Sequence, residues 1–206
     1  MITTLVARGI SKSFGKRSVL STFSHEFVGG AITGIVGPNG SGKSTLAKIL
    51  AGLLRPDTGD VELRLANQMI QRVDIPFHCG YVAPYLTLYD EFTPHELLVM
   101  HGAFHGIDLP SSSCDEIIQR VGLSARATSR VRTFSSGMRQ RVALALAVSI
   151  DPAVLVLDEP STTLDESGRL ILTTEIQRAS QRGAIVLIAT NDARERDLCT
   201  HTIEVA

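Results

Sequence analysis

A stretch at positions 37–45 has the residue types and the spacing of a phosphate-binding loop. It reads Gly-Pro-Asn-Gly-Ser-Gly-Lys-Ser-Thr and matches the pattern G-x-x-x-x-G-K-[ST]. Its glycines allow backbone conformations that other residues avoid, so several N–H groups can converge on one anion. Lys43 can reach the β- and γ-phosphates of a nucleotide, and Ser44 can hold Mg²⁺. The predicted nucleotide-binding residues are Gly37, Pro38, Asn39, Gly40, Ser41, Gly42, Lys43, Ser44 and Thr45.

Two acidic residues, Asp158 and Glu159, can supply the rest of the phosphate chemistry. They follow an apolar run at 154–157, which predicts a strand buried on both faces of a parallel sheet. At the carboxyl end of such a strand, Asp158 can bind Mg²⁺ and Glu159 can polarise a water for in-line attack on the γ-phosphate. Solvated carboxylates at a strand end are the alternative, which the loop in the same chain disfavours. Kinases, GTPases and ATPases share the loop, so other motifs must distinguish them.

A second predicted anion site lies at residues 134–141, which read Phe-Ser-Ser-Gly-Met-Arg-Gln-Arg. The serines and the glycine open a predicted helix, whose first N–H groups and dipole favour an anion. Simple N-capping of a long helix by Ser135 is the alternative. Nothing nearby in the sequence uses this second anion site.

The predicted elements place these groups at strand and helix ends. An apolar run at 32–36 precedes the loop, and apolar residues recur at helical spacing over 46–53 behind it. Further strands are predicted at 5–10, 19–27, 61–65, 79–83, 154–157, 185–189 and 202–205, the last at a sheet edge. A helix is predicted over 164–181, with its inward face formed by Leu170, Ile171, Thr174 and Ile176.

Residues 84–151 show no convincing strand pattern and predict a helical subdomain. Thr93 as N-cap and Pro94 at the first helical position predict a helix start. Its expected apolar face consists of Leu97, Leu98, Met100 and Phe104, and further helices are expected at 114–121 and 137–149. The chain is therefore predicted to be one domain, 1–206, with the nucleotide-binding core at 1–83 and 152–206.

Composition narrows the function classes. The 20 basic and 21 acidic residues nearly cancel, so a broad nucleic-acid-binding surface is not expected. The apolar stretch at 142–150 is too short to cross a bilayer, and the N-terminus lacks a signal-peptide pattern. The three cysteines form no C-x-x-C pair, which fits a reducing cytoplasm. His101 and His105 have a spacing that zinc can use, but a solvated helix face is favoured.

Taken together, the motifs resemble the ATP-binding cassette of ABC transporters over essentially the whole chain. Walker A is 37–45, the signature is 134–138, and Walker B is 154–158 with Glu159 directly after it. Residues 161–165, Ser-Thr-Thr-Leu-Asp, resemble the D-loop. Phe14 sits where the family has the aromatic residue that stacks on adenine. The resemblance implies an α/β P-loop NTPase fold with a mixed sheet, flanking helices, an N-terminal antiparallel β part and a helical subdomain.

The resemblance also implies how such a cassette works. Two copies, or one copy and a homologous cassette, would form a head-to-tail dimer that holds each ATP between one Walker A and the other signature. Hydrolysis would drive a separate transmembrane permease, with this chain on the cytoplasmic face of the membrane. The chain length resembles that of stand-alone exporter cassettes, but the direction of transport, import or export, stays open. The implied roles are Glu159 as base, Asp158 and Ser44 as Mg²⁺ ligands, Ser135, Ser136 and Gly137 at the partner's ATP, and Asp165 in the D-loop.

Three departures from the family pattern bear on turnover. The signature reads Phe-Ser-Ser-Gly-Met instead of Leu-Ser-Gly-Gly-Gln, a mild change. Pro84 replaces the Q-loop glutamine and offers no side-chain ligand. Asn191 replaces the switch histidine; its amide can donate to a γ-phosphate but cannot become cationic. We therefore expect ATP binding with slow hydrolysis, and Asn191 as a substitute γ-phosphate sensor.

Other functions remain open at this point. A regulatory nucleotide-binding module with little turnover, a non-transport ABC ATPase and a small-molecule kinase all share the loop. The kinase gives no reason for the signature helix, and non-transport ABC proteins usually carry paired cassettes or long inserts. The apolar segment 84–92 favours the transport subunit, because a cytoplasmic helix of the permease docks there in the family. We expect at least two of its residues to be exposed among Tyr85, Leu88, Tyr89 and Phe92.

Overall fold

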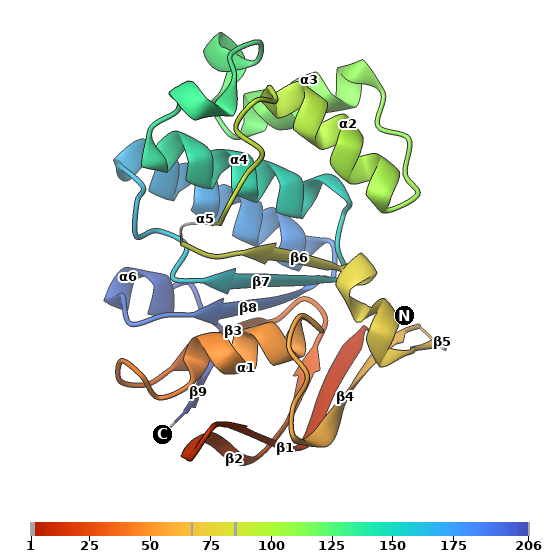
Figure 1. Ribbon diagram of the computed structural model, residues 1–206, viewed down its shortest axis with the longest axis vertical. Coiled ribbons are helices and arrows are strands. Elements are labelled where there is room, and N and C mark those ends of the chain that lie inside the picture. Colours follow the sequence, from red (N-terminus) through yellow and green to blue (C-terminus); the bar gives the residue numbers. More distant parts are fainter. Residues whose placement is uncertain (1–2, 67, 85, 206) are drawn as a thin grey trace.

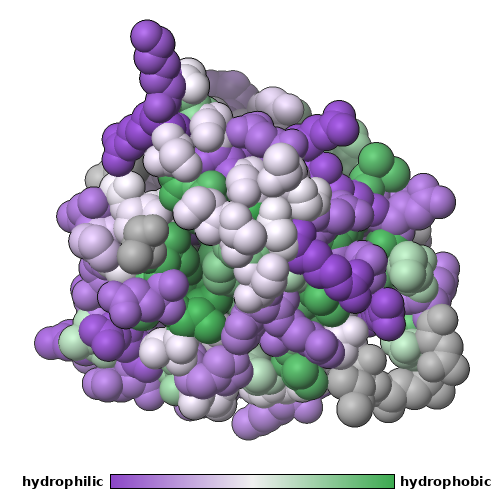
Figure 2. Space-filling model, turned by 90° about the horizontal axis from the view of Figure 1, so that it is seen from below, coloured by the Kyte–Doolittle hydropathy of each residue, from purple (hydrophilic) through white to green (hydrophobic). Residues whose placement is uncertain are grey.

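The N-terminal part of the chain forms a four-stranded antiparallel sheet (Figure 1). The computed structural model describes residues 3–66, 68–84 and 86–205. Phe14 and Arg17 pair across the first hairpin, whose turn contains Gly15 at a φ of 60°. The face of the molecule on this side is mostly hydrophilic, with hydrophobic residues in separate spots (Figure 2). In the order β2-β1-β4-β5, the strands are β2 (Arg17–Val28), β1 (Thr4–Phe14), β4 (Thr58–Leu65) and β5 (Gln68–Ile70).

A five-stranded sheet lies at the centre of the molecule, and all its pairings are parallel. Every residue of β7 and β8 is buried, as their continuous apolar sequences predict for strands covered on both faces. The carboxyl ends of the strands meet at one edge, where ligands bind in sheets of this kind. In the order β6-β7-β8-β3-β9, the strands are β6 (Cys79–Val82), β7 (Val154–Asp158), β8 (Ile185–Ala189), β3 (Ile32–Val36) and β9 (His201–Glu204).

Helices cover both faces of the parallel sheet (Figure 1). On one face α1 (Lys43–Leu50) lies between the two sheets, and on the other lie α4 (Ser136–Ser149) and α5 (Glu166–Gln181). The remaining helices are α2 (Pro94–Phe104), α3 (Ser111–Arg120), α6 (Ala193–Arg196) and the 3₁₀ turns η1 (Arg72–His78), η2 (Ser124–Arg126) and η3 (Val131–Thr133).

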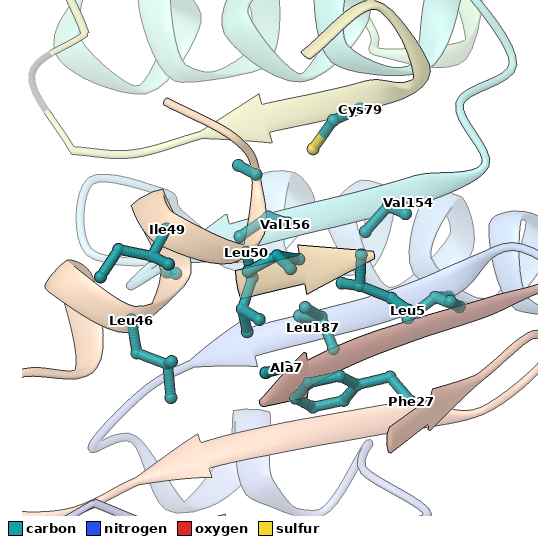
Figure 3. Close-up of a cluster of buried hydrophobic side chains, with 14 of the residues drawn as sticks. Leu5, Ala7, Phe27, Leu46, Ile49, Leu50, Cys79, Val154, Val156 and Leu187 are labelled. Carbon is teal, nitrogen blue, oxygen red and sulfur yellow. The ribbon is translucent and has the colours of Figure 1, made fainter. Parts of the chain in front are cut away.

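Three clusters of buried apolar side chains hold these layers together. The first joins both sheets through α1 and includes Leu5, Phe27, Leu50 and Val156 (Figure 3). The second packs α4 and α5 on the opposite face of the parallel sheet. The third joins α2, α3 and α4. Burial of apolar side chains on both faces therefore holds the parallel sheet, and with it the carboxyl ends of its strands, in place.

The start of α2 agrees with the prediction. Thr93 Oγ1 accepts a hydrogen bond from Glu96 N at 3.2 Å, and Glu96 Oε2 accepts one from Thr93 N at 2.8 Å. This reciprocal capping box satisfies two backbone donors that the first turn of a helix would otherwise leave free. Pro94 stands directly after the cap, where its missing N–H costs nothing.

Some residues that were predicted to face inward on α2 and α5 are exposed. Phe104 on α2 is 70% exposed and Leu170 on α5 is 69% exposed, while Thr174 is exposed too. Ile176 is buried and Ile171 is partly buried, as predicted, and Leu172 joins them on the buried face of α5. Leu170 lies roughly 200° around the helix from Leu172, because each residue turns an α-helix by about 100°.

The prediction also misplaced one histidine and missed several short elements, namely β5, η1, η2, η3 and α6. The strand β5 and the turn η1 lie between the predicted strands at 61–65 and 79–83. His101 does not lie on a solvated face, since its ring is partly buried and its Nδ1 lies 3.2 Å from Ser149 Oγ. Among the described residues, no group of three or more His, Cys, Asp or Glu could hold a metal ion.

Candidate nucleotide-binding site

The phosphate-binding loop joins the end of β3 to the start of α1. Gly40 and Gly42 have φ values of 81° and 104°, a region that favours glycine. A Cβ atom at Gly37 would lie 2.2 Å from Val205 O, and one at Gly42 would lie 2.9 Å from Val19 Cγ1. The shape of the loop therefore requires glycine at these positions, and it leaves the backbone open toward the pocket.

The loop holds Lys43 in a position suited to phosphate. Lys43 is only 5% exposed, and its Nζ donates to Gly37 O at 2.8 Å and to Pro38 O at 3.0 Å. Ser41 Oγ is buried and has no hydrogen-bond partner in the described part of the chain. The N-cap residue of α1 gives no side-chain hydrogen bond, so the N-terminus of this helix can receive an anion. A nucleotide phosphate fits this combination of an ammonium group, a spare hydroxyl and a helix N-terminus.

Ser44 and Asp158 meet at the edge of the parallel sheet. Ser44 Oγ donates to Asp158 Oδ1 at 2.9 Å, and Tyr81 OH lies 3.5 Å from Asp158 Oδ2. Burial raises the pKa of Asp158 above its usual range, and burial followed by the charge of Asp158 raises the pKa of Tyr81. One hydroxyl and one carboxylate are suitable oxygen ligands for Mg²⁺, which takes its remaining ligands from water and nucleotide phosphates. The pair therefore fits a cation that arrives with a nucleotide.

Glu159 has a strained backbone and faces the same pocket. Its φ of 41° is unusual for a residue other than glycine, and this conformation costs roughly 1–2 kcal/mol. Glu159 N donates to Ala189 O at 2.8 Å, and Glu159 O accepts from Thr162 Oγ1 at 2.9 Å. Neighbouring strands and the following turn thus hold the strained residue in place, a pattern found at functional sites.

A pocket of about 270 Å³ brings most of the predicted residues together. Phe14 stands exposed at its rim, and Lys12 Nζ lies 5.5 Å from the centre of the Phe14 ring. Arg17 also lines the pocket and donates from Nη2 to Gly40 O at 3.2 Å. Arg17 was not predicted, because no sequence motif marks this cation on β2 of the antiparallel sheet. The lining consists of Phe14, Arg17, Val19, Asn39, Gly40, Gly42, Lys43, Ser44, Thr45 and Glu159.

Asn191 lies on the other side of the phosphate-binding loop. Its Nδ2 donates a hydrogen bond to Asn39 Oδ1. Together with Gly37 and Pro38, it lines a neighbouring pocket of about 410 Å³. Pro84 follows β6, is partly buried, and is absent from the lining of both pockets. Asn191 is thus near the loop, as a phosphate sensor would need to be, whereas Pro84 supplies no ligand to either pocket.

The signature residues lie outside the nucleotide pocket. Ser135 caps α4 by accepting a hydrogen bond from Met138 N at 3.3 Å, and Ser136 is exposed beside it. A Cβ atom at Gly137 would lie 2.9 Å from Thr163 O, so this glycine allows α4 to approach the segment after Glu159. Ser136 lines a separate groove of about 270 Å³ instead. Within one chain, the fold does not bring the signature to the phosphate-binding loop.

Asp165 has a local role in the same segment. It caps α5, and its Oδ1 accepts from Gly168 N at 2.7 Å and from Ser167 Oγ at 2.9 Å. These hydrogen bonds hold the pKa of Asp165 below its usual range. The predicted D-loop aspartate is therefore exposed and ionised at the start of a helix.

The apolar segment after β6 is partly exposed, as the sequence predicts. Tyr89 is 66% exposed and Phe92 is 39% exposed, with their rings in an edge-to-face contact at 6.1 Å. Leu88 is buried, and Tyr85 lies outside the described residues. The expectation of at least two exposed residues is confirmed by Tyr89 and Phe92.

Comparison with known families adds to this geometry. A sequence model for the family described as ABC transporter matches residues 20–162, which include the loop, the signature and both acidic residues. The chain belongs to the ABC transporter family. As an ABC nucleotide-binding domain, it has its Walker A and Walker B motifs at the edge of the parallel sheet described above.

Curated relatives align with almost the whole cassette. It is 31% identical to the daunorubicin resistance ATP-binding protein DrrA3 of Streptomyces coeruleorubidus, over 98% of this chain and 65% of that protein. It is 34% identical to the uncharacterized ABC transporter ATP-binding protein YdbJ of Bacillus subtilis, over 95% and 64%. It is 32% identical to the Nod factor export ATP-binding protein I of a Bradyrhizobium species, over 93% and 63%. The chain thus spans 63–65% of the length of these relatives.

Solved structures share the fold of this cassette. An ATP-binding subunit of an ABC transporter matches with a TM-score of 0.85 at 24% identity, over 98% of this chain and 85% of that one. A dimeric bacterial ABC transporter cassette matches with a TM-score of 0.86 at 22% identity, over 98% and 94%. The predicted ABC-ATPase fold is therefore confirmed.

Proposed function

We propose that this cassette is the ATP-binding subunit of an ABC transporter and that it hydrolyses ATP. The observation that carries the proposal is the meeting of Ser44, Asp158 and Glu159 beside the phosphate-binding loop. A binding module needs the loop alone, whereas a carboxylate strained into the same pocket serves hydrolysis. The ATP-binding proteins for drug resistance and Nod factor export among the relatives support a role in transport, with export as the direction.

The side chains divide the work of hydrolysis between them. Lys43 and the loop N–H groups bind and orient the β- and γ-phosphates, and Phe14 stacks on the adenine. Ser44 and Asp158 would hold Mg²⁺, which would neutralise phosphate charge. Glu159 accepts a proton from the attacking water, and Asn191 donates a hydrogen bond to the γ-phosphate.

A second cassette completes each site in this proposal. Ser135, Ser136 and Gly137 open α4 away from the nucleotide pocket of their own chain, so their N–H groups and helix dipole serve the ATP of a partner. The partner is a second copy or a homologous cassette in head-to-tail orientation. A solved neighbour of the same fold is a dimeric cassette, which supports this arrangement.

A membrane permease is the second proposed partner, which places the cassette on the cytoplasmic face of the membrane. No helix in the described ranges is long and apolar enough to span a bilayer. Tyr89 and Phe92 stand exposed beside the groove that Leu86, Leu88 and Arg139 line. Exposed aromatic residues bury large areas at a modest entropy cost, so they suit a docking helix. In the proposed division into a core at 1–83 and 152–206 and a helical subdomain at 84–151, the subdomain supplies most of the groove and the core supplies Thr163.

Steady-state phosphate release tests the proposed activity. The unmodified protein with Mg²⁺ and ATP should release phosphate continuously, and Glu159→Gln should release none above background while still binding ATP. Equal rates in the two proteins would remove Glu159 from the mechanism. Tight ATP binding without release by either protein would favour a regulatory nucleotide-binding module.

The docking proposal has a separate test. Replacing both Tyr89 and Phe92 with Ala should weaken co-purification with a co-expressed permease and leave ATP binding intact. Met69→Ala removes an equally exposed apolar side chain from β5 and serves as the matched control. Unchanged assembly of the double variant would exclude this surface as the docking site.

A further inference from the structure

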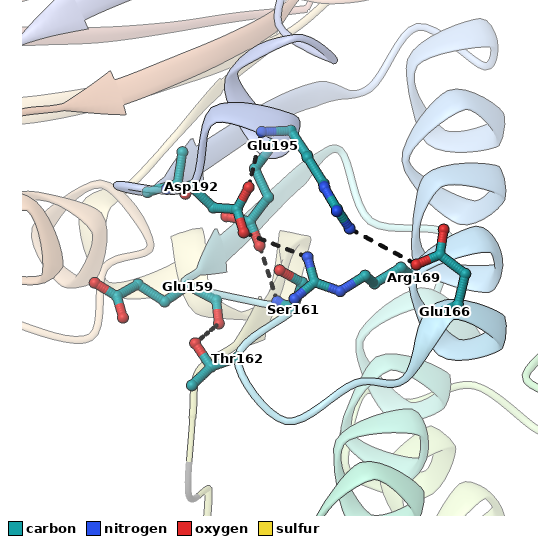
Figure 4. A network of polar contacts seen from close by, with 9 residues as sticks. Glu159, Ser161, Thr162, Glu166, Arg169, Asp192 and Glu195 are labelled. Atoms are coloured by element: carbon teal, nitrogen blue, oxygen red, sulfur yellow. Dashed lines mark hydrogen bonds and ion pairs between the residues drawn. The ribbon is translucent and has the colours of Figure 1, made fainter.

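A buried glutamate on α6 contacts the turn that follows Glu159. Glu195 is 4% exposed, and its Oε1 accepts a hydrogen bond from Ser161 N at 2.9 Å (Figure 4). Its Oε2 is buried without a hydrogen-bond partner among the described residues, so an ion pair does not explain why a carboxylate lies here. Buried carboxylates are costly unless they are compensated. The hydrogen bond to the Ser161 amide is therefore the contact through which Glu195 can act.

Hydrogen bonds within the turn and from neighbouring elements hold the backbone from Glu159 to Thr162. Glu159 N donates to Ala189 O, and Thr162 closes the turn on the Glu159 carbonyl group. Two side chains from outside the turn add further contacts: Gln140 Nε2 on α4 donates to Pro160 O at 3.1 Å, and Glu195 accepts from Ser161 N. Because Glu159 has a φ of 41°, its conformation persists only while the surroundings determine it. The Glu159 side chain points away from Glu195, on the opposite side of the turn (Figure 4).

The helix that carries Glu195 is itself fixed relative to the phosphate-binding loop. Its N-cap, Asp192, directly follows Asn191, whose amide contacts Asn39 in that loop. Asp192 caps the helix by accepting from Arg194 N at 2.7 Å, and its Oδ2 lies 3.3 Å from Arg169 Nη1 on α5. The carboxylate of Glu195 thus has a defined place between the loop, α5 and the turn.

We propose that Glu195 is a positioning residue for ATP hydrolysis, which rests on the proposed function above. By holding Ser161 N, it keeps the turn closed and the Glu159 carboxylate directed into the nucleotide pocket. This effect depends on the side-chain length that brings its acceptor oxygen to Ser161 N, and not on its negative charge. Nucleotide affinity does not depend on it, because Glu195 is absent from the lining of the pocket.

Two substitutions of Glu195 separate the effect of side-chain length from the effect of charge. Glu195→Asp keeps the charge but shortens the side chain by one methylene, which withdraws the acceptor from Ser161 N. Glu195→Gln keeps the length and one acceptor oxygen but removes the charge. We expect the Asp variant to lose roughly 10- to 100-fold in kcat, because displacements on the order of 1 Å have such effects. Its KM for ATP should change little, and the Gln variant should retain a kcat within about threefold of the unmodified protein.

A neighbouring residue provides the control. Arg194 forms an exposed ion pair with Glu166 at 3.7 Å, which contributes little because it is solvated. Arg194→Ala should therefore leave kcat and KM unchanged. An equal loss of kcat in the Gln and Asp variants would overturn the proposal, as would an unchanged kcat in a folded Asp variant.

Amide hydrogen exchange separates this inference from the proposed activity. In nucleotide-free protein, the Ser161 amide should exchange faster in Glu195→Asp than in the unmodified protein or in Glu195→Gln. If the unmodified protein releases no phosphate, the proposed function fails, while exchange still decides whether Glu195 holds the turn. Equal protection of Ser161 in all three proteins would overturn the positioning role.

Discussion

At the residue scale, the ammonium group of Lys43 is the loop's positive charge for a nucleotide phosphate. Two loop carbonyl groups compensate its burial, at 2.8 Å and 3.0 Å from Nζ. Those hydrogen bonds place a positive charge at the loop, where phosphate oxygens also meet the N-terminus of α1. Neighbouring Ser41 Oγ has no partner among the described residues, so the loop has donors to spare for an anion.

Lys43→Ala should remove most of the affinity for ATP. The change deletes the buried ammonium group of the loop and leaves two carbonyl groups without their donor. Equilibrium binding of a fluorescent ATP analogue measures the effect, with Arg64→Ala as a control that removes an exposed cation from β4. Unchanged affinity in Lys43→Ala would contradict the assignment of the loop.

Asn191→His should increase turnover. The Asn191 amide lies near the phosphate-binding loop, where it contacts Asn39, but it cannot offset the charge that develops during phosphate transfer. The loss of one such donor can cost about 10²–10³ in rate, so we expect slow phosphate release in the unmodified protein and faster release in the variant. A rate that is unchanged or lower in Asn191→His would show that the site works with asparagine and has no deficit there.

At the scale of elements, strong local sequence signals were sufficient to predict individual strands and helix starts. The strands at 32–36 and 185–189 were predicted with the bounds that the structure has, because both are continuous apolar runs. The start of α2 followed from Thr93 and Pro94, since the capping box is a local interaction. The strand β5 and the turn η1 were missed, because their sequences carry no clear period and their packing depends on distant segments.

The candidate site likewise contains residues that local sequence motifs predicted and residues that they did not. The loop motif and the acidic pair are each a continuous stretch of sequence, and each follows a predicted strand of a parallel sheet. The sequence therefore placed Lys43, Asp158 and Glu159 in one candidate site. Tyr81 reaches that site from β6, the neighbour of β7 in the parallel sheet, and Arg17 reaches it from β2 of the antiparallel sheet. No short-range pattern encodes the strand order of the parallel sheet or the way the two sheets pack.

The contact between α2 and α4 predicts a pH effect on stability. Burial, followed by the nearby charge of His105, lowers the pKa of His101 from 6.5 to about 4. Between these pH values the unfolded chain binds a proton that the folded chain excludes, so the free energy of unfolding should fall as the pH is lowered from 6.5 toward 4. Above pH 6.5 His101 is neutral in both states and contributes no pH dependence.

Urea unfolding at pH 7.5 and pH 5 measures this effect. The drop in stability between the two values should be smaller in His101→Gln than in the unmodified protein. His95→Gln removes a histidine from the first turn of the same helix and serves as a control for net charge. An equal drop in the unmodified protein and in His101→Gln would exclude His101 as the source.

At the scale of the whole molecule, the proposed dimer assigns one cassette halves of two different ATP sites. The nucleotide pocket includes Lys43 and Glu159, while Ser136 at the start of α4 faces a separate groove. The start of α4 is exposed in one chain, and a helix N-terminus favours an anion, so the nucleotide of a partner fits there. The central claim is therefore that ATP joins two cassettes head to tail before Glu159 promotes its hydrolysis.

The mass of Glu159→Gln in solution tests that claim most directly. The substitution keeps the shape of the side chain but removes the base, so bound ATP should join two copies and persist. Size-exclusion chromatography with light scattering should show a dimer in Mg-ATP and a monomer in Mg-ADP. The added exposed substitution Ser136→Arg should return the protein to a monomer that still binds ATP. A Glu159→Gln variant that binds ATP yet remains monomeric at high concentration would contradict the account.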